Sequence, residues 1–332
     1  MKNRLLCLSA IALAASSFSV QSNAATACVF DLMGTNGPTY NLMKDYALQA
    51  KSWGVNMTLK AYTDERVASE DFAAKKCDVL SATGMRARKY NKFVGSLDAI
   101  GAAPSKKVTY EAMKLIADPK LASKMKSNGY EVLGTIPLGA AYLFVDDRSI
   151  DTVAKAAGKR FAVLDHDKSQ AKMVARLGAQ PVSSDITTFA GKFNNGQVDM
   201  IGAPAMAYKP LELAKGLGTK GAIIKFPILQ VTNMIVAQDS AFTDAQAQNS
   251  REWFAGQLPA MFKMIQRDES DIPAKYWHDI PANDEIGYVK LMRDGRMSMT
   301  AEGDYDPSMM KLLKKVRCQV NPASFECSLQ GE

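Results

Sequence analysis

The chain has 332 residues, of which 47% are hydrophobic and 23% are charged, and its formal net charge is +7. This length is enough for two lobes, and the positive charge is mild for so long a chain. Acidic residues are interspersed among the basic ones, so we expect a solvated surface and no nucleic-acid partner.

The first 24 residues have the features of an export signal. Lys2 and Arg4 make a basic start, residues 5–15 form an apolar core, and Ser22-Asn23-Ala24 supplies the small residues that a signal peptidase reads. Cleavage is therefore expected near Ala24. No later stretch approaches the roughly 20 apolar residues of a transmembrane helix, so we expect an exported protein without direct membrane insertion.

From residue 28 the hydrophobic pattern predicts a βαβαβ unit. Its parts are a strand at 28–33, a glycine-rich loop at 34–38, a helix that Gly54 ends, a strand at 55–61, a helix at 63–76 and a strand that follows Asp78. Beyond the unit we expect a helix at 86–93, a strand and loop at 95–104, and a long amphipathic helix at 107–128.

Residues 131–145 form two apolar runs that Pro137 and Gly139 interrupt, and we expect the chain to cross there into a second lobe. That lobe should contain a helix at 149–157, a strand at 160–164, a loop at 165–169, a helix to Leu177 and a strand after Asp199. Residues 221–237 then return to the first lobe, and the chain after 241 is helical. The predicted organisation is a signal peptide at 1–24, lobe one at 25–140 plus 235–285, lobe two at 141–234, and a C-terminal helical segment with a disulfide-closed tail at 286–332.

Removal of the signal leaves Cys28, Cys77, Cys318 and Cys327. An even number in an oxidising compartment favours two disulfides, with three possible pairings. Cys318 and Cys327 bracket a short loop, and Cys28 and Cys77 each precede an apolar run that should form neighbouring parallel strands. We therefore predict local pairing in the tail and a Cys28–Cys77 bridge.

The sequence pattern of residues 72–89 recurs, with substitutions, at 193–210. In both segments a Phe is followed six residues later by an Asp, then by a buried strand, a sharp turn and a Met. Because open α/β sheets bind ligands at the carboxyl ends of strands, two such edges predict a cleft with one wall from each lobe. Two unrelated strand-turn segments of similar composition remain an alternative explanation.

The motifs of common enzymes are missing from the sequence. There are two histidines and no GxSxG, HExxH or P-loop pattern, so we expect neither catalysis nor a cofactor. The Asp165-His166-Asp167 run suggests a polar loop at the cleft edge more than a metal site, because adjacent residues rarely converge on one ion. We assign His278 to helix packing.

Two loops at the predicted strand edges are the better candidates for a binding site. The 34–37 loop precedes a helix, so free N–H groups and the positive end of the helix dipole should face the cleft. The 83–88 turn adds two guanidinium groups, which suit carboxylate or phosphate. The matching turn at 203–208 is apolar, and residues at the crossings complete the set. The predicted ligand-binding residues are Thr35, Asn36, Tyr40, Thr83, Met85, Arg86, Arg88, Tyr142, Asp165, His166, Met206, Tyr208 and Asn233.

Three segments carry a family resemblance: Ala157-Gly158-Lys159-Arg160, LGAQPV at 177–182 and FNNGQVDMIGAP at 193–204. With them the chain resembles the periplasmic solute-binding proteins of TRAP transporters. It is most similar to the AdeT group, whose members are often labelled as RND efflux components linked to aminoglycoside resistance.

The resemblance implies an α/β, two-lobed periplasmic-binding-protein fold of type II, with parallel-rich sheets flanked by helices. It also implies a monomer in the periplasm that captures a small polar or anionic solute and delivers it to membrane transporter subunits. The alternative is a periplasmic accessory of an efflux system. One departure matters, because Ala162 stands where the family usually carries a carboxylate-clamping Arg.

Overall fold

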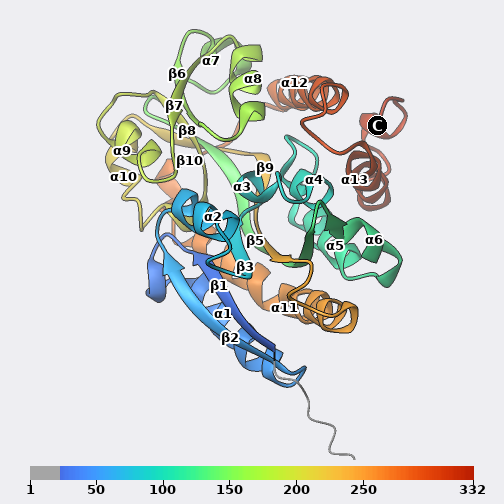
Figure 1. Cartoon of the computed structure of the whole chain (residues 1–332). Coiled ribbons are helices and arrows are strands. Elements are labelled where there is room, and N and C mark those ends of the chain that lie inside the picture. Colours follow the sequence, from blue (N-terminus) through green and yellow to red (C-terminus); the bar gives the residue numbers. More distant parts are fainter. Residues whose placement is uncertain (1–22) are drawn as a thin grey trace, which may run out of the picture.

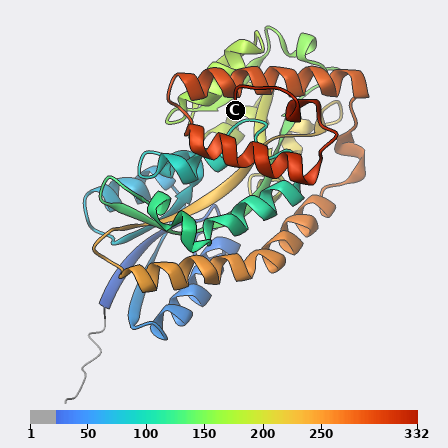
Figure 2. The same ribbon diagram turned by 90° about the vertical axis from the view of Figure 1, so that its right-hand side faces the viewer.

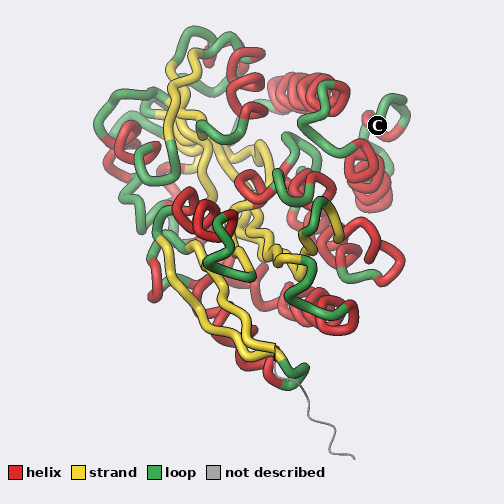
Figure 3. Tube along the Cα trace, viewed as in Figure 1, coloured by secondary structure: helices red, strands yellow, loops and turns green. Residues whose placement is uncertain are grey.

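The computed structural model describes residues 23–332, in which ten strands join in a single mixed sheet (Figure 3). The main path runs in the order β2-β1-β3-β9-β5-β8-β6-β7, while β10 pairs with β9 and β4 with β5. The strands are β1 Asn23–Phe30, β2 Val55–Tyr62, β3 Val79–Thr83, β4 Lys126–Ser127, β5 Tyr130–Val145, β6 Arg160–Leu164, β7 Gln180–Ser184, β8 Met200–Pro204, β9 Ala222–Gln238 and β10 Trp277–His278. Residues 1–22 of the predicted signal segment lie outside the described residues, and its last two residues, Asn23 and Ala24, begin β1.

Helices flank the sheet along its whole length (Figure 1). The α-helices are α1 Pro38–Lys51, α2 Glu65–Ala73, α3 Gly84–Ala87, α4 Lys92–Gly95, α5 Lys106–Ile116, α6 Ala122–Met125, α7 Val153–Ala156, α8 Lys168–Arg176, α9 Phe189–Asn194, α10 Ala214–Leu217, α11 Asp244–Ser270, α12 Ala282–Ala301 and α13 Pro307–Val320. None of the helices in this part of the chain is both long and apolar enough to cross a bilayer.

The strand pairing pattern is almost the same from either edge of the sheet. β1 is parallel to β2 and β3 on one side, and β6 is parallel to β7 and β8 on the other. β3 then pairs antiparallel with β9, β8 pairs antiparallel with β5, and β5 pairs antiparallel with β9 in the middle. We refer to β2, β1 and β3 with α1–α6 as lobe one, and to β8, β6 and β7 with α7–α10 as lobe two.

Two long strands connect the lobes. β5 and β9 each continue from one half of the sheet into the other, so the predicted crossings are made within strands rather than in loops. Register shifts interrupt their pairing at Val132/Gly134, Pro137/Gly139 and Ala141/Leu143. Gly139 has a φ of +105°, a value that other residues rarely adopt. The break that the sequence indicated at Pro137 and Gly139 is thus a bulge in one strand.

Three predicted elements are wrong. The helix expected at 86–93 is divided into α3 and α4 by a turn that Asn91 ends. The long helix expected at 107–128 ends at Ile116, because Asp118 precedes Pro119 and its side chain caps a new turn by accepting a hydrogen bond from the Lys120 N–H. The strand expected within 95–104 is absent from the described structure. Asn91 caps α4 there, and a 3-10 turn follows at Ser96–Asp98.

The C-terminal segment spans both lobes (Figure 2). α12 packs against α7 and α8 of lobe two, whereas α13 packs against α4 and α5 of lobe one. Two buried arginines hold the tail, because Arg296 bonds the carboxylates of Glu326 and Glu332 and Arg317 bonds Glu332. Nη1 of Arg296 donates to the carbonyl of Ile100, and Nη1 of Arg317 donates to that of Ala102.

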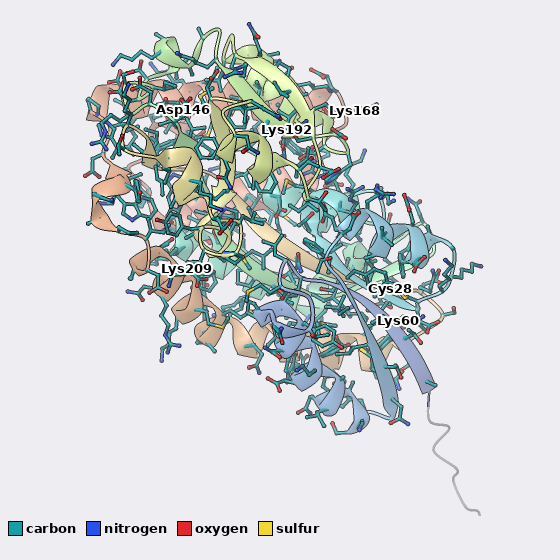
Figure 4. The ribbon with its side chains drawn as sticks, turned by 90° about the vertical axis from the view of Figure 1, so that its left-hand side faces the viewer. Cys28, Lys60, Asp146, Lys168, Lys192 and Lys209 are labelled. Carbon is teal, nitrogen blue, oxygen red and sulfur yellow. A yellow bond between two sulfur atoms is a disulfide. The ribbon has the colours of Figure 1, made fainter. Side chains whose placement is uncertain are left out.

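The two disulfides join Cys28 to Cys77 and Cys318 to Cys327, which is the pairing expected from the sequence. The first ties β1 to the start of β3, and the second closes the tail after α13. Figure 4 labels Cys28 beside Lys60, its register partner on β2. Both bridges fix loop ends and restrict the unfolded chain.

Candidate functional site

A cavity of about 150 Å³ lies between the lobes. Its wall combines the carboxyl ends of β1 and β3 from lobe one, β6, α8 and β8 from lobe two, and α12 of the C-terminal segment. Most of the lining is apolar, including Phe161, Phe189, Met173, Met200, Leu229 and Met292. The cavity therefore occupies the position that the two strand edges predicted, and a third wall completes it.

A wider groove of about 580 Å³ adjoins the cavity and shares Asp31, Leu32 and Met206 with it. It runs between the start of α1, the turn after β8 and the end of α11. Lys209, labelled in Figure 4, lies on this groove and pairs with Asp271 at 2.5 Å. We interpret the groove as the mouth of the cleft, because residues common to both spaces connect it with the interior.

The start of α1 is occupied by the chain's own carboxylate. Asp31 accepts hydrogen bonds from the N–H groups of Thr39 and Tyr40 with one oxygen and from that of Met33 with the other. A Cβ at Gly37 would lie 1.7 Å from this carboxylate, so glycine is required there. The N–H groups that the sequence assigned to an anionic ligand thus bind Asp31 in this structure. The side chains of Thr35, Asn36 and Tyr40 lie outside the cavity lining.

Arg86 also faces a partner within the protein. Its Nε lies 3.4 Å from Oε1 of Glu65, whose other oxygen accepts a 2.7 Å hydrogen bond from the Thr83 hydroxyl. His166 of lobe two lies 3.4 Å from the same Glu65 oxygen. Burial raises the pKa of Glu65, and burial together with Arg86 lowers the pKa of His166 to about 4.

Arg88 links the lobes as well. Its Nη1 donates to Oδ1 of Asp167 at 3.2 Å and its Nε donates to the carbonyl of Gly95 at 3.0 Å, with the guanidinium over the ring of Tyr305. Asp167 caps α8 in lobe two by accepting from the Ser169 N–H. Neither Arg86 nor Arg88 is in the cavity lining, so the structure does not bring the two predicted guanidinium groups into the cavity. Buried carboxylates, one of them from the other lobe, hold both guanidinium groups.

Four of the predicted residues do line the cavity, namely Thr83, Met85, Met206 and Asn233. Met85 and Met206 come from the two equivalent turns. Asn233 on β9 is 1% exposed, and its Nδ2 lies 3.5 Å from the Ser81 hydroxyl. Ala162, at the position of the expected clamping Arg, also belongs to the lining.

The remaining candidates face elsewhere. Side chains alternate along a strand, so Ala141 and Leu143 line the cavity while Tyr142 points to the other face, where its hydroxyl donates to Glu269. Tyr208 lines the outer groove, Asp165 is exposed and accepts from Ser183, and His166 lies with its Nε2 3.4 Å from Oε1 of Glu65. In the described part of the chain, no cluster of three or more His, Cys, Asp or Glu side chains suits a metal ion.

Sequence reasoning missed the wall that α12 provides. Tyr288, Leu291 and Met292 of this helix line the cavity, although they lie far along the chain from both strand edges. Their spacing at i, i+3 and i+4 is the signal that could have identified a buried helix face. Gln170, which follows the predicted polar loop, lines the cavity too, with Oε1 accepting from the Leu164 N–H at 3.0 Å.

The model of the family described as "Solute-binding protein AdeT 1/2" matches residues 51–332. The chain belongs to this family. A curated relative, "Probable solute-binding protein AdeT1" of Acinetobacter baumannii, is 49% identical over 304 residues, which cover 92% of this chain and all of the relative. The protein is therefore a solute-binding protein, as the sequence resemblance predicted.

Solved structures show the same fold at low sequence identity. A TRAP periplasmic solute-binding protein from Desulfovibrio salexigens with bound orotic acid has a TM-score of 0.73 at 14% identity, covering 90% of this chain and 99% of that one. One from Ralstonia eutropha H16 with bound (S)-2-acetolactate has a TM-score of 0.73 at 10% identity, with the same coverage. The predicted two-lobed α/β fold of TRAP type is confirmed.

Proposed function

We propose that this protein captures a small solute in the cavity between its lobes and delivers it to a membrane transporter. The observation that carries the proposal is an internal cavity at the strand edges of both lobes, in a chain that belongs to a solute-binding family. Thr83, Met85, Met206 and Asn233 are the predicted residues that we propose contact the solute. The structural neighbours carry small acids, which shows that a cavity of this fold can enclose a small solute.

The contacts between lobes support a binding cycle with opening and closing. Arg88 with Asp167 and Glu65 with His166 join lobe one to lobe two beside the cavity. A solute enclosed in this way leaves only when such contacts separate, and β5 and β9 are the continuous elements about which the lobes would turn. We therefore propose a hinge within these two strands, near their bulges.

The proposal also covers the location, the oligomeric state and the lobe boundaries of the protein. The protein acts in the periplasm after cleavage near Ala24, which retains the β1 residues that pair with β3. It acts as a monomer, performs no covalent chemistry, and meets the membrane only through transporter subunits. Its lobes comprise residues 25–140 plus 235–285 and 141–234, and the segment 286–332 covers both.

Native mass spectrometry of protein purified from its own periplasm tests the proposal. We expect a retained small molecule that is lost on unfolding and refolding. Adding the recovered molecule back should lower the radius of gyration in X-ray scattering as the lobes close. A protein that retains nothing, or that binds without any change in its radius, would contradict solute capture by closure.

A further inference from the structure

The cavity differs in chemistry from a site built for an acid. Asp31 is the one charged side chain among the described residues that line it, and both of its oxygens already accept hydrogen bonds from the N–H groups of Met33, Thr39 and Tyr40. Ala162 contributes a methyl group where a clamping guanidinium was expected. A carboxylate placed here would lose its water without gaining an opposite charge, which is unfavourable.

The guanidinium groups near the cavity are already paired. Arg86 faces Glu65, and Arg88 is held by Asp167 and the Gly95 carbonyl. Release of either one to bind a ligand would leave a buried carboxylate unpaired, because the side chains of Glu65 and Asp167 are 0% and 4% exposed. Both pairs therefore oppose recruitment of these cations by a solute.

Two residues of the lining, Asn233 and Tyr288, each carry a buried polar atom without a hydrogen-bond partner within the part of the chain that the structure describes. These atoms are Oδ1 of Asn233 and Oη of Tyr288. Burial raises the pKa of Tyr288 to about 12, so its hydroxyl remains neutral. Buried polar atoms of this kind are normally satisfied, and a bound molecule is a natural partner.

The size of the cavity limits what the apolar part of a ligand can be. An engineered apolar cavity of about 150 Å³ in another protein stays dry and takes up benzene. The present cavity has the same volume, and Met85, Met173, Met200, Met206 and Met292 contribute adaptable side chains to its wall. A six-membered ring with a small substituent matches this space.

We propose that the solute is a neutral, ring-sized apolar molecule with one hydrogen-bonding group that meets Asn233 or Tyr288. This inference rests on the proposed function and specifies its ligand class. A site of this kind should select against acids of the same shape, because its polar atoms can pair with an amide or hydroxyl but cannot balance a negative charge.

Calorimetric titration of the full mature chain with three probes tests the ligand class at neutral pH. Benzamide and benzoate have nearly the same shape and differ in charge, while toluene reports on the apolar part alone. We expect benzamide to bind at least tenfold more tightly than benzoate. Equal or tighter binding of benzoate would overturn the proposal, as would failure of both benzamide and toluene at millimolar concentrations.

Two conservative substitutions locate the polar contact. The double variant Asn233→Leu/Tyr288→Phe should weaken benzamide binding at least fivefold. Its toluene binding should be unchanged, which also shows that the variant is folded. Unchanged benzamide affinity in the double variant would overturn the assignment of the polar group. Binding of succinate, glucuronate or orotate in place of the neutral probes would reject the ligand class and leave solute capture standing. If the acids also fail and no molecule is retained from the periplasm, the proposed function fails as well.

Discussion

The two strand-turn segments at 72–89 and 193–210 share a backbone and differ in the use of their charges. Asp78 and Asp199 each accept a 2.7 Å hydrogen bond from the backbone of the neighbouring strand, at Thr26 and Arg160 respectively. The helix that precedes each strand ends in the same turn, closed by bonds from the Lys76 N–H to the Asp71 carbonyl and from the Gln197 N–H to the Lys192 carbonyl.

Beyond the strands the two segments diverge. The turn of lobe one carries Arg86 and Arg88, which meet Glu65 and the Asp167 of lobe two, whereas the matching positions of lobe two are Ala207 and Lys209. Ala207 lines the cavity, and Lys209 is exposed at its mouth. The cationic turn therefore contacts the other lobe, while apolar side chains from both turns line the cavity.

The largest expected effect is a difference in the free energy of unfolding between variants of Arg88 and of Lys209. Arg88→Met leaves Asp167 buried without its partner and should lower the free energy of unfolding by about 3–5 kcal/mol. Lys209→Met removes an exposed pair and should change it by less than about 1 kcal/mol. Urea unfolding of both variants measures the difference. Equal costs would show that the two turns do not differ in the way described.

A smaller effect concerns pH. The pKa of His166 is about 4 in the folded protein and near 6.5 in the unfolded chain, so the unfolded chain takes up the proton first as the pH falls. Protonation of His166 in the unfolded chain therefore lowers the free energy of unfolding as the pH falls from 6.5 toward 4. His166→Gln should gain about 2 kcal/mol relative to the wild type on going from pH 7 to pH 5.

Urea unfolding at both pH values measures this relative change, and the comparison with wild type cancels the opposing titration of buried acids such as Asp98, whose pKa burial raises to about 7. A relative stability that does not depend on pH would mean that His166 is not held neutral between the lobes.

The smallest expected effect is a change in stability at two equivalent backbone positions of the segments. Lys75 and Gly196 occupy the same position after the two helices, with φ values of 58° and 66°. Glycine tolerates this conformation, so Lys75→Gly should stabilise the protein and Gly196→Ala should destabilise it, each by about 1 kcal/mol. Thermal unfolding of the pair checks the prediction. Effects of the same sign would break the equivalence.

The sequence predicted most of the fold and a part of the site. Local patterns were sufficient for β6, for the cysteine pairing, and for the position of the cavity between equivalent strand edges. Arg86 and Arg88 were assigned to the ligand because their partners come from residues that sequence spacing does not connect. Asp167, for example, lies 79 residues after Arg88.

Tyr142 was predicted to contact the ligand from the crossing, whereas its side chain lies outside the cavity lining. Side-chain alternation gives the two faces of a strand but does not say which face meets a cavity. The α12 wall depends on long-range packing in the same way, because its apolar residues show a buried helix face without showing what it covers.

A crystal structure of the protein with bound benzamide tests the central claim most directly. The account predicts that the ring lies in the cavity between the lobes, with the amide within hydrogen-bond distance of Asn233 or Tyr288. It also predicts that Arg86 and Arg88 keep their contacts with Glu65 and Asp167. A probe bound against either arginine, with those contacts broken, would contradict it.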